Sequence, residues 1–249
     1  MRVRVEGSAN SQRPALVFIH GAGGAATVWL DLFRHFERER RVVALDLPGH
    51  GQSDPWHDVD DRGRIAYYRD AVGVACAHLA IKKAILVGHS MGGLVALAAA
   101  AAHPDKVAGV VMLASAASMK PAPSLLNALL ASPHQQAEIL AELGWSPSTP
   151  RDTVARWFRT VTGATPEITL ADLRGVLAFD SEPLLREVSA RVLLLAGADD
   201  LLCPPALVEA SAKALRYAEL AIVPEAGHQL HLEQPAATIA AIETFATYV

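Results

Sequence analysis

Residues 84–92, with the sequence AILVGHSMG, join a short apolar run to a Gly-x-Ser-x-Gly pentapeptide centred on Ser90. An alanine-rich helical pattern, Met91–Ala102, follows directly. A serine on such a sharp strand-to-helix turn is held in a strained backbone geometry with its hydroxyl raised to solvent, and Gly88 and Gly92 are small enough to permit this. The pentapeptide alone would also suit a glycine-rich turn, but a strand before it and a helix after it favour a nucleophilic serine.

Short apolar runs alternate with longer helical patterns along most of the chain, as is typical of βαβ units stacked into a mostly parallel sheet. The apolar runs are rich in Val, Leu and Ile on both faces, and they are Ala15–His20, Val42–Asp46, Ala84–Gly88, Val107–Leu113, Arg191–Ala196 and Ala218–Val223. Helices are expected at Ala26–Phe36, Arg62–Leu79, Met91–Ala102, Pro205–Leu215 and Pro235–Thr247. The sequence therefore predicts an α/β fold with a mostly parallel central sheet flanked by helices, and Val3–Glu6 as a short edge strand.

The interval from Ser118 to Glu187 interrupts this alternation. It is punctuated by prolines and carries helical patches without a strong strand pattern. We interpret it as an inserted helical cap, residues 118–187, on a core made of residues 1–117 and 188–249. The leucines and aromatic residues of the interval suit either packing of the cap on the core or the lining of a pocket.

The composition predicts a packed globular protein, because 51% of the 249 residues are hydrophobic and 19% are charged. A net charge of −4 and the scattering of the 22 Lys and Arg residues argue against nucleic acid or a membrane surface as a partner. No apolar window reaches bilayer length and the first residues do not resemble a signal peptide, so a cytoplasmic location is expected. Cys76 and Cys203 are expected to be buried thiols, and no cluster of side chains has the spacing of metal ligands.

A serine hydroxyl needs a general base, usually a histidine that a carboxylate orients. Two loops after later strands offer these groups. The sequence GADDLLCP, residues 197–204, contains two adjacent aspartates, and PEAGH, residues 224–228, ends on a histidine. Both follow the nucleophile in the order acid and then histidine, which is the order found on strand-to-helix serine scaffolds.

Five motifs in this order resemble the α/β-hydrolase superfamily of esterases, lipases and related enzymes over essentially the whole chain. They are HGAGG at 20–24, DLPGHGQS at 46–53, the elbow around Ser90, the loop at 197–204, and GH at 227–228 followed by HLEQP at 231–235. One departure is the N-terminus, where relatives carry a two-stranded hairpin and this chain has only Met1–Pro14 before its first central strand. An edge strand is therefore expected to be missing.

The resemblance assigns roles to particular residues. The acid loop of the family has the form Gly-x-x-Asp-x-x-x-Pro, which selects Asp200 over Asp199 as the residue that orients the base. The base itself is expected at His228, while His231 and His89 are the alternatives. His231 would anchor packing, and His89 would face the wrong way across the elbow to accept the serine proton.

The resemblance also implies an oxyanion hole formed by the backbone amides of Ala22 and Met91. We expect contacts to substrate from Gly21 and from three residues of the cap, namely Leu129, Trp157 and Phe158. The Asp46 loop is a structural turn in the family, and neither a cofactor nor a metal is expected. A phosphate-binding reading of the glycine-rich turn is disfavoured, because the turn lacks a Gly-Lys-Ser/Thr ending.

These residues predict a serine hydrolase that cleaves a small carboxylic ester through an acyl-enzyme. Carbon–carbon bond hydrolysis, a lactonase activity and a haloperoxidase-like activity use the same triad and stay open as alternatives. Serine at the elbow disfavours dehalogenases and epoxide hydrolases, whose relatives use a carboxylate nucleophile. A ligand-binding receptor without catalysis is the rival from another class, but its usual marker is a broken triad, and all three members are present here. The sequence leaves the oligomeric state open.

Overall fold

The structure is a computed structural model of the 249-residue chain. It describes residues 1–8, 11–54, 59–119, 139, 142–160 and 163–249, without the side chains of 156 and 158–160. In the described part, one seven-stranded sheet has the order β1-β3-β2-β4-β5-β6-β7. Its strands are β1 (Arg2–Glu6), β2 (Ala15–Ile19), β3 (Val42–Asp46), β4 (Ala84–His89), β5 (Val107–Leu113), β6 (Arg191–Gly197) and β7 (Ala218–Val223).

The strands occur where the apolar runs predict them. Strands β2 to β7 are parallel to their neighbours, and β1 pairs with β3 in the antiparallel direction. All residues of β2, β3 and β4 are buried, which explains their continuous apolar character. Strand β1 is mostly exposed, and the charges of Arg2, Arg4 and Glu6 blunt this edge of the sheet. It is the single strand described before β2, so the expected hairpin is reduced to one strand.

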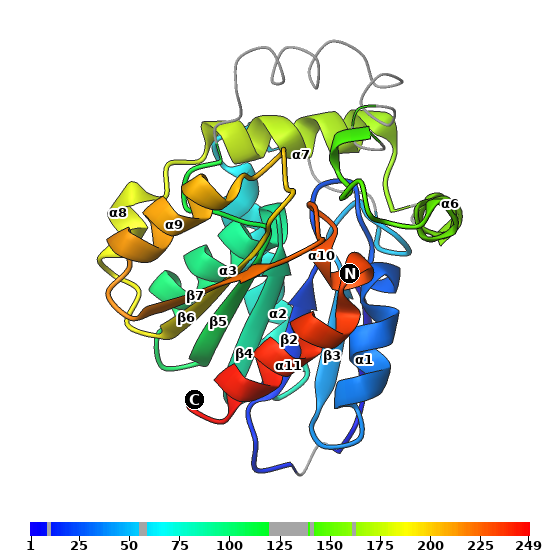
Figure 1. The fold of residues 1–249 in the computed structure, drawn as a ribbon. Coiled ribbons are helices and arrows are strands. Elements are labelled where there is room, and N and C mark those ends of the chain that lie inside the picture. Colours follow the sequence, from blue (N-terminus) through cyan, green and yellow to red (C-terminus); the bar gives the residue numbers. More distant parts are fainter. Residues whose placement is uncertain (9–10, 55–58, 120–138, 140–141, 161–162) are drawn as a thin grey trace.

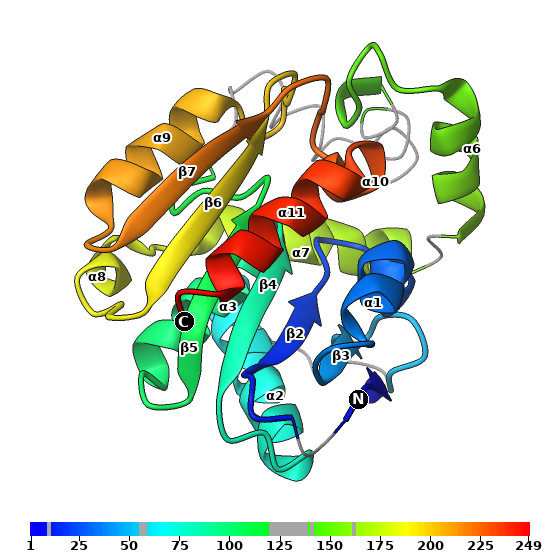
Figure 2. The ribbon, with the colours of Figure 1, turned by 60° about the horizontal axis from the view of Figure 1, so that its bottom comes forward.

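Helices cover both faces of the sheet (Figures 1 and 2). One apolar cluster joins alternate sheet residues such as Val17 and Leu86 to α2 (Arg64–His78), α3 (Met91–Ala102) and α9 (Pro205–Ala214). On the other face, residues such as Phe18 and Val87 pack against α1 (Leu30–Phe36) and α11 (Pro235–Ala246). The predicted helices are confirmed, with one difference at the first of them. Its first residues form the separate 3-10 helix η1 (Ala26–Trp29).

Three helices are described between β5 and β6, and they are α6 (Arg151–Thr160), α7 (Pro166–Ala178) and α8 (Glu182–Leu185). Helix α7 crosses one end of the sheet in Figure 1. There it packs over the turn that follows β2, because a Cβ added to Gly23 would lie 2.5 Å from Oγ1 of Thr169. The boundaries of the cap, residues 118–187, stay a prediction. In the described part of the chain, no helix combines the length and apolarity that crossing a bilayer requires.

Candidate active site

Ser90 lies at the junction of β4 and α3, where it occupies the N-cap position of the helix. Its backbone has φ 50° and ψ −119°, a conformation that costs a non-glycine residue about 1–3 kcal/mol. The turn is held by hydrogen bonds from Ser90 N to the Leu113 carbonyl and from Gly93 N to the Ser90 carbonyl, each 2.9 Å long. The side chain of this strained residue is partly exposed, as a nucleophile requires.

The two glycines of the pentapeptide allow close backbone packing around Ser90. A Cβ added to Gly88 would lie 2.1 Å from the Gly92 carbonyl oxygen, and one added to Gly92 would lie 2.2 Å from the carbonyl oxygen of Ile19. Any larger residue at either position must therefore push backbone apart. The sequence-based reason for these glycines is confirmed by this packing.

His228 and Asp200 are brought together from the loops that follow β7 and β6. The Nδ1 of His228 donates to Oδ2 of Asp200 at 2.9 Å, and both side chains are buried. The other carboxylate oxygen, Oδ1, accepts from the backbone amides of Leu202 and Cys203, each at 2.8 Å. Burial raises the pKa of Asp200, but attraction to His228 and these hydrogen bonds outweigh it, so the pKa is lowered. An ionised carboxylate therefore fixes one tautomer of the imidazole and leaves Nε2 as an acceptor.

Asp199, the competing acid, points to a different partner. Its Oδ2 accepts a hydrogen bond from the hydroxyl of Ser146 at 2.6 Å. The structure thus places Asp200 on His228 and Asp199 on the segment between β5 and β6. Consecutive residues of a tight turn project in different directions, which is why adjacent aspartates can have separate contacts.

The two alternative histidines form a buried cluster of tilted rings beside His228. The Nε2 of His89 donates to the backbone carbonyl of His228 at 2.8 Å, and the two rings are 4.9 Å apart. The ring of His231 lies 4.7 Å from those of His89 and Trp29, and it has no exposed surface. His89 thus supports the loop of the expected base, and His231 packs between the rings of His89 and Trp29. Because His89 adjoins Ser90, these contacts also bring His228 close to the elbow.

Burial of three neutral histidines predicts acid sensitivity. Burial, followed by repulsion from His228, lowers the pKa of His89 to about 3. Burial is also the largest cause of the lowered pKa of His20, followed by repulsion from His50. The pKa of His231 is lowered first by burial and then by repulsion from His89. The unfolded chain binds protons at histidine near pH ~6.5, so below that pH it binds more protons than the folded chain. We expect the free energy of unfolding to fall on acidification by up to about 4 kcal/mol per pH unit.

Urea unfolding between pH 7.5 and 5 measures this slope. The control is His231→Leu, which removes one buried titrating group and should reduce the slope by about 1.4 kcal/mol per pH unit. An unchanged slope in this variant would contradict the assignment of acid sensitivity to the buried histidines.

The glycine-rich turn after β2 lies against the nucleophile. A Cβ added to Gly21 would be 3.2 Å from Cβ of Ser90, and Gly24 N donates to the Gly21 carbonyl at 3.1 Å to close the turn. Ala22 lies inside this turn and is partly exposed. Met91 is the first residue of α3, where backbone amides have no acceptor within the helix. Both segments expected to form an oxyanion hole therefore adjoin Ser90, while the roles of Ala22 and Met91 stay predictions.

The expected cap contacts are only partly described by the structure. Trp157 on α6 is partly buried, and its ring meets that of Trp145 edge-on with centroids 5.7 Å apart. Leu129 and the side chain of Phe158 lie outside the described residues. Within the described ranges, no group of three or more His, Cys, Asp or Glu side chains is arranged to hold a metal ion.

Glu233, for which no role is predicted from the sequence, connects the histidine loop to the segment before α6. Its Oε1 accepts from the backbone amides of Gly227 and Gln229, at 3.0 and 3.1 Å, on either side of His228. Its Oε2 accepts from Ser146 N at 2.7 Å and from the Thr149 hydroxyl at 2.5 Å. A carboxylate four to six residues after a Gly-His turn was the local sequence signal for these contacts.

Replacing Glu233 with glutamine is expected to destabilise the protein. A carboxylate accepts all four hydrogen bonds, whereas an amide would present its NH₂ group to two of the donors and leave at least one backbone amide unpaired. We expect a loss of about 2–4 kcal/mol and a Tm lower by roughly 5–15 °C, measured by thermal unfolding. Glu225→Gln, an exposed position in the same loop, is the matched control and should shift Tm by less than about 2 °C. Equal shifts in the two variants would contradict the role of Glu233.

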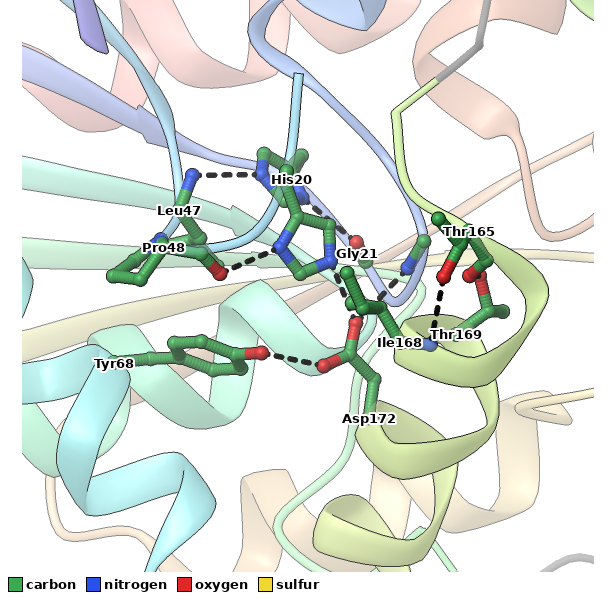
Figure 3. Close-up of polar contacts among 11 residues, drawn as sticks. His20, Gly21, Leu47, Pro48, Tyr68, Thr165, Ile168, Thr169 and Asp172 are labelled. Carbon is green, nitrogen blue, oxygen red and sulfur yellow. Dashed lines mark hydrogen bonds and ion pairs between the residues drawn. The ribbon is translucent and has the colours of Figure 1, made fainter. Parts of the chain in front are cut away.

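Asp172 of α7 is a fully buried carboxylate that sequence reasoning also missed. It accepts hydrogen bonds from His50, Tyr68 and Gly23, which come from three separate segments of the chain (Figure 3). Asp46 holds its own loop against the start of η1, accepting from Gln52 N at 3.0 Å and from Ala26 N at 2.7 Å. These contacts agree with the expected structural role of its loop.

Comparison with known proteins agrees with this architecture. The model of the Alpha/beta hydrolase family matches residues 16–242. A Caulobacter sp. (strain K31) protein named as the carbamate hydrolase RutD is 30% identical, with 97% of this chain and 93% of that protein covered. A solved structure of a thermophilic esterase from Thermogutta terrifontis has a TM-score of 0.86 at 25% identity, covering 99% of this chain and 93% of that one.

A further match is only partial. The dihydrolipoyllysine-residue acetyltransferase component of the acetoin cleaving system of Pseudomonas putida is 45% identical over 101 residues, so the alignment spans 26% of that protein and 41% of this one. The family model, in contrast, covers most of the chain, including the elbow and both loops that carry Asp200 and His228. The chain therefore belongs to the alpha/beta hydrolase family and has its fold.

Proposed function

We propose that the protein is a serine hydrolase that cleaves small carboxylic esters. The observation that carries this proposal is the buried Asp200–His228 hydrogen bond of 2.9 Å beside the strained elbow of Ser90. A neutral imidazole oriented by a carboxylate is the base that a serine nucleophile needs. The similarity to an esterase structure supports esters as the substrate class.

In the proposed mechanism, Oγ of Ser90 attacks the ester carbonyl carbon and its proton moves to Nε2 of His228. The amides of Ala22 and Met91 stabilise the oxyanion, and Asp200 stabilises the imidazolium. The ester C–O bond then breaks, and the alcohol leaves with the proton from His228. Water attacks the acyl-enzyme with His228 again as base, which releases the carboxylic acid and restores Ser90.

Substrate contacts are proposed on two sides of the elbow. Gly21 lies against Ser90, where a Cβ would come within 3.2 Å of Cβ of Ser90. Because glycine has no side chain, this space is left for the substrate carbonyl. The cap residues Leu129, Trp157 and Phe158 are proposed to contact an apolar acyl or aromatic group. We propose that the protein acts on free small molecules in the cytoplasm.

A fluorophosphonate probe and a series of p-nitrophenyl esters test the proposal. We expect the probe to label Ser90, identified by mass spectrometry of the labelled peptide, and acetate to octanoate esters to be hydrolysed. A p-nitrophenyl carbamate should react more slowly than the esters. Absence of both labelling and turnover would overturn the proposal, and a carbamate that reacts faster than every ester would replace the substrate class.

A further inference from the structure

The carboxylate of Asp172 links α7 to the glycine-rich turn beside Ser90. Asp172 is fully buried, and its Oδ1 accepts from the Tyr68 hydroxyl at 2.6 Å. Its Oδ2 accepts from Nε2 of His50 at 2.8 Å and from the backbone amide of Gly23 at 3.0 Å. Figure 3 shows the three donors converging on one carboxylate. Burying a charge is costly, and this set of donors compensates for it.

The bond to Gly23 reaches the turn from the side of α7. On its other side, the turn is held by His20, whose Nδ1 donates to the Gly21 carbonyl at 2.8 Å while its Nε2 accepts from Leu47 N at 3.1 Å. Ala22 lies between Gly21 and Gly23, the two residues that are held. The orientation of the Ala22 peptide is therefore limited from both directions.

The turn also packs directly under α7. Gly23 has φ +65°, and a Cβ there would lie 2.5 Å from Oγ1 of Thr169, one turn before Asp172 on the same helix. The turn thus has both a steric contact and a hydrogen bond to α7. Any shift of α7 must move Gly23 or break these contacts.

Connecting the cap to the core does not require the contact to Gly23. The bonds from His50 and Tyr68 already fasten α7 to the core, and the hydroxyl of Ser181 fastens the other end of this segment by donating to the Ala117 carbonyl. What the bond from Gly23 adds is control over the turn next to the nucleophile.

We propose that Asp172 is a positioning residue for the oxyanion hole, so that the seating of α7 sets the orientation of the Ala22 amide. This inference rests on the proposed hydrolase function. Asp172 acts through the Gly23 amide and makes no contact with the reacting atoms. Oxyanion stabilisation depends on donors held in place before the reaction, so a loosened turn lowers kcat more than it changes KM.

The first test is Asp172→Ala, assayed on a p-nitrophenyl ester. We expect kcat to fall by about 10- to 100-fold and KM to change by less than about threefold, because a displaced donor weakens the transition state. Affinity for an aryl trifluoromethyl ketone, which forms a tetrahedral oxyanion adduct, should fall in step with kcat. Asp172→Asn keeps an acceptor for Gly23 and should recover most of kcat.

Ser181→Ala is the matched control, because it removes a buried hydrogen bond between the same segment and the core away from the turn. It should lower Tm and leave kcat within about twofold of wild type. A purely structural role for Asp172 predicts instead that its alanine variant lowers Tm with kcat unchanged below the unfolding range, and that result would overturn the proposal.

Gly23→Ala tests the same link from the turn and does not depend on the folding of Asp172→Ala. The added Cβ collides with Thr169, so the turn must move away from α7 and kcat should fall by at least about tenfold. In the double variant, Asp172→Ala should add little further loss, since both changes break one connection. Unchanged kcat in Gly23→Ala, or full additivity, would overturn the proposal.

Amide hydrogen exchange separates this inference from the proposed function, because it needs no substrate. Peptides covering residues 20–26 should exchange faster in Asp172→Ala than in wild type, and Ser181→Ala should not change them. Equal exchange in wild type and Asp172→Ala would overturn the positioning role even in an active enzyme. Failure of the fluorophosphonate probe to label wild-type Ser90 would instead count against the hydrolase function.

Discussion

Replacing Ser90 with alanine is expected to reduce kcat for p-nitrophenyl esters by about a millionfold, close to complete loss of activity. The hydroxyl is the proposed nucleophile, and no acyl-enzyme forms without it. In this variant, substrate binding and the oxyanion donors alone would still accelerate hydrolysis about 10³-fold over the uncatalysed reaction in water. Steady-state assays with enough enzyme to detect a millionfold loss, together with the fluorophosphonate probe, measure this effect.

The fold of the Ser90→Ala variant should be preserved, because the hydrogen bonds described at this residue use its backbone N and carbonyl. A Tm within about 2 °C of wild type would show this. The double variant with His228→Ala should be no less active than Ser90→Ala, because nucleophile and base act as a unit. Retention of more than about a hundredth of wild-type kcat in Ser90→Ala would contradict the nucleophile assignment.

The sheet and the elbow could be predicted because their physical causes are local. Parallel strands buried on both faces must be apolar at every position, so runs such as Ala15–Ile19 and Val42–Asp46 are visible in the sequence. The elbow is equally visible, because a Cβ at Gly88 or Gly92 would lie only 2.1 or 2.2 Å from a backbone carbonyl oxygen, so both positions need glycine. In both cases, the constraint and the residue that satisfies it lie in one short stretch.

Asp172 could not be predicted, because its partners are distant along the chain. His50, Tyr68 and Gly23 precede it by 122, 104 and 149 residues, and no local pattern relates them. An aspartate inside a helix looks like a surface residue in the sequence, since an unpaired buried carboxylate is so costly. Only the packing of α7 over the core shows that three donors meet there.

Glu233 is an intermediate case. It follows Gly227 and Gln229 by six and four residues, so its contacts to their backbone amides are local. Its contacts to Ser146 and Thr149 span 87 and 84 residues and depend on the segment before α6. The sequence therefore contained a signal for a carboxylate that supports the histidine loop, but none for its connection to the segment before α6.

Replacing Asp200 with asparagine is expected to lower kcat by about 10⁴-fold. Asparagine can keep Oδ1 as the acceptor for Leu202 N and Cys203 N, but it then presents its NH₂ group to Nδ1 of His228. Nδ1 of the imidazole must then accept this hydrogen bond, so the ring adopts the tautomer that carries its proton on Nε2. In that tautomer, His228 cannot accept the proton of Ser90. Steady-state kinetics across pH 6 to 9 measure the loss.

Asp199→Asn is the matched control, because it removes a charge from the neighbouring residue. Its side chain can still accept the hydrogen bond from Ser146, so kcat should stay within about threefold of wild type. The pair of variants decides between two adjacent aspartates that the sequence ranked only through a family motif. A large loss in Asp199→Asn together with a small one in Asp200→Asn would reverse the assignment. The lowered pKa keeps Asp200 of the wild type ionised throughout this range, and asparagine does not titrate. The loss of kcat in Asp200→Asn relative to wild type should therefore not be recovered at high pH.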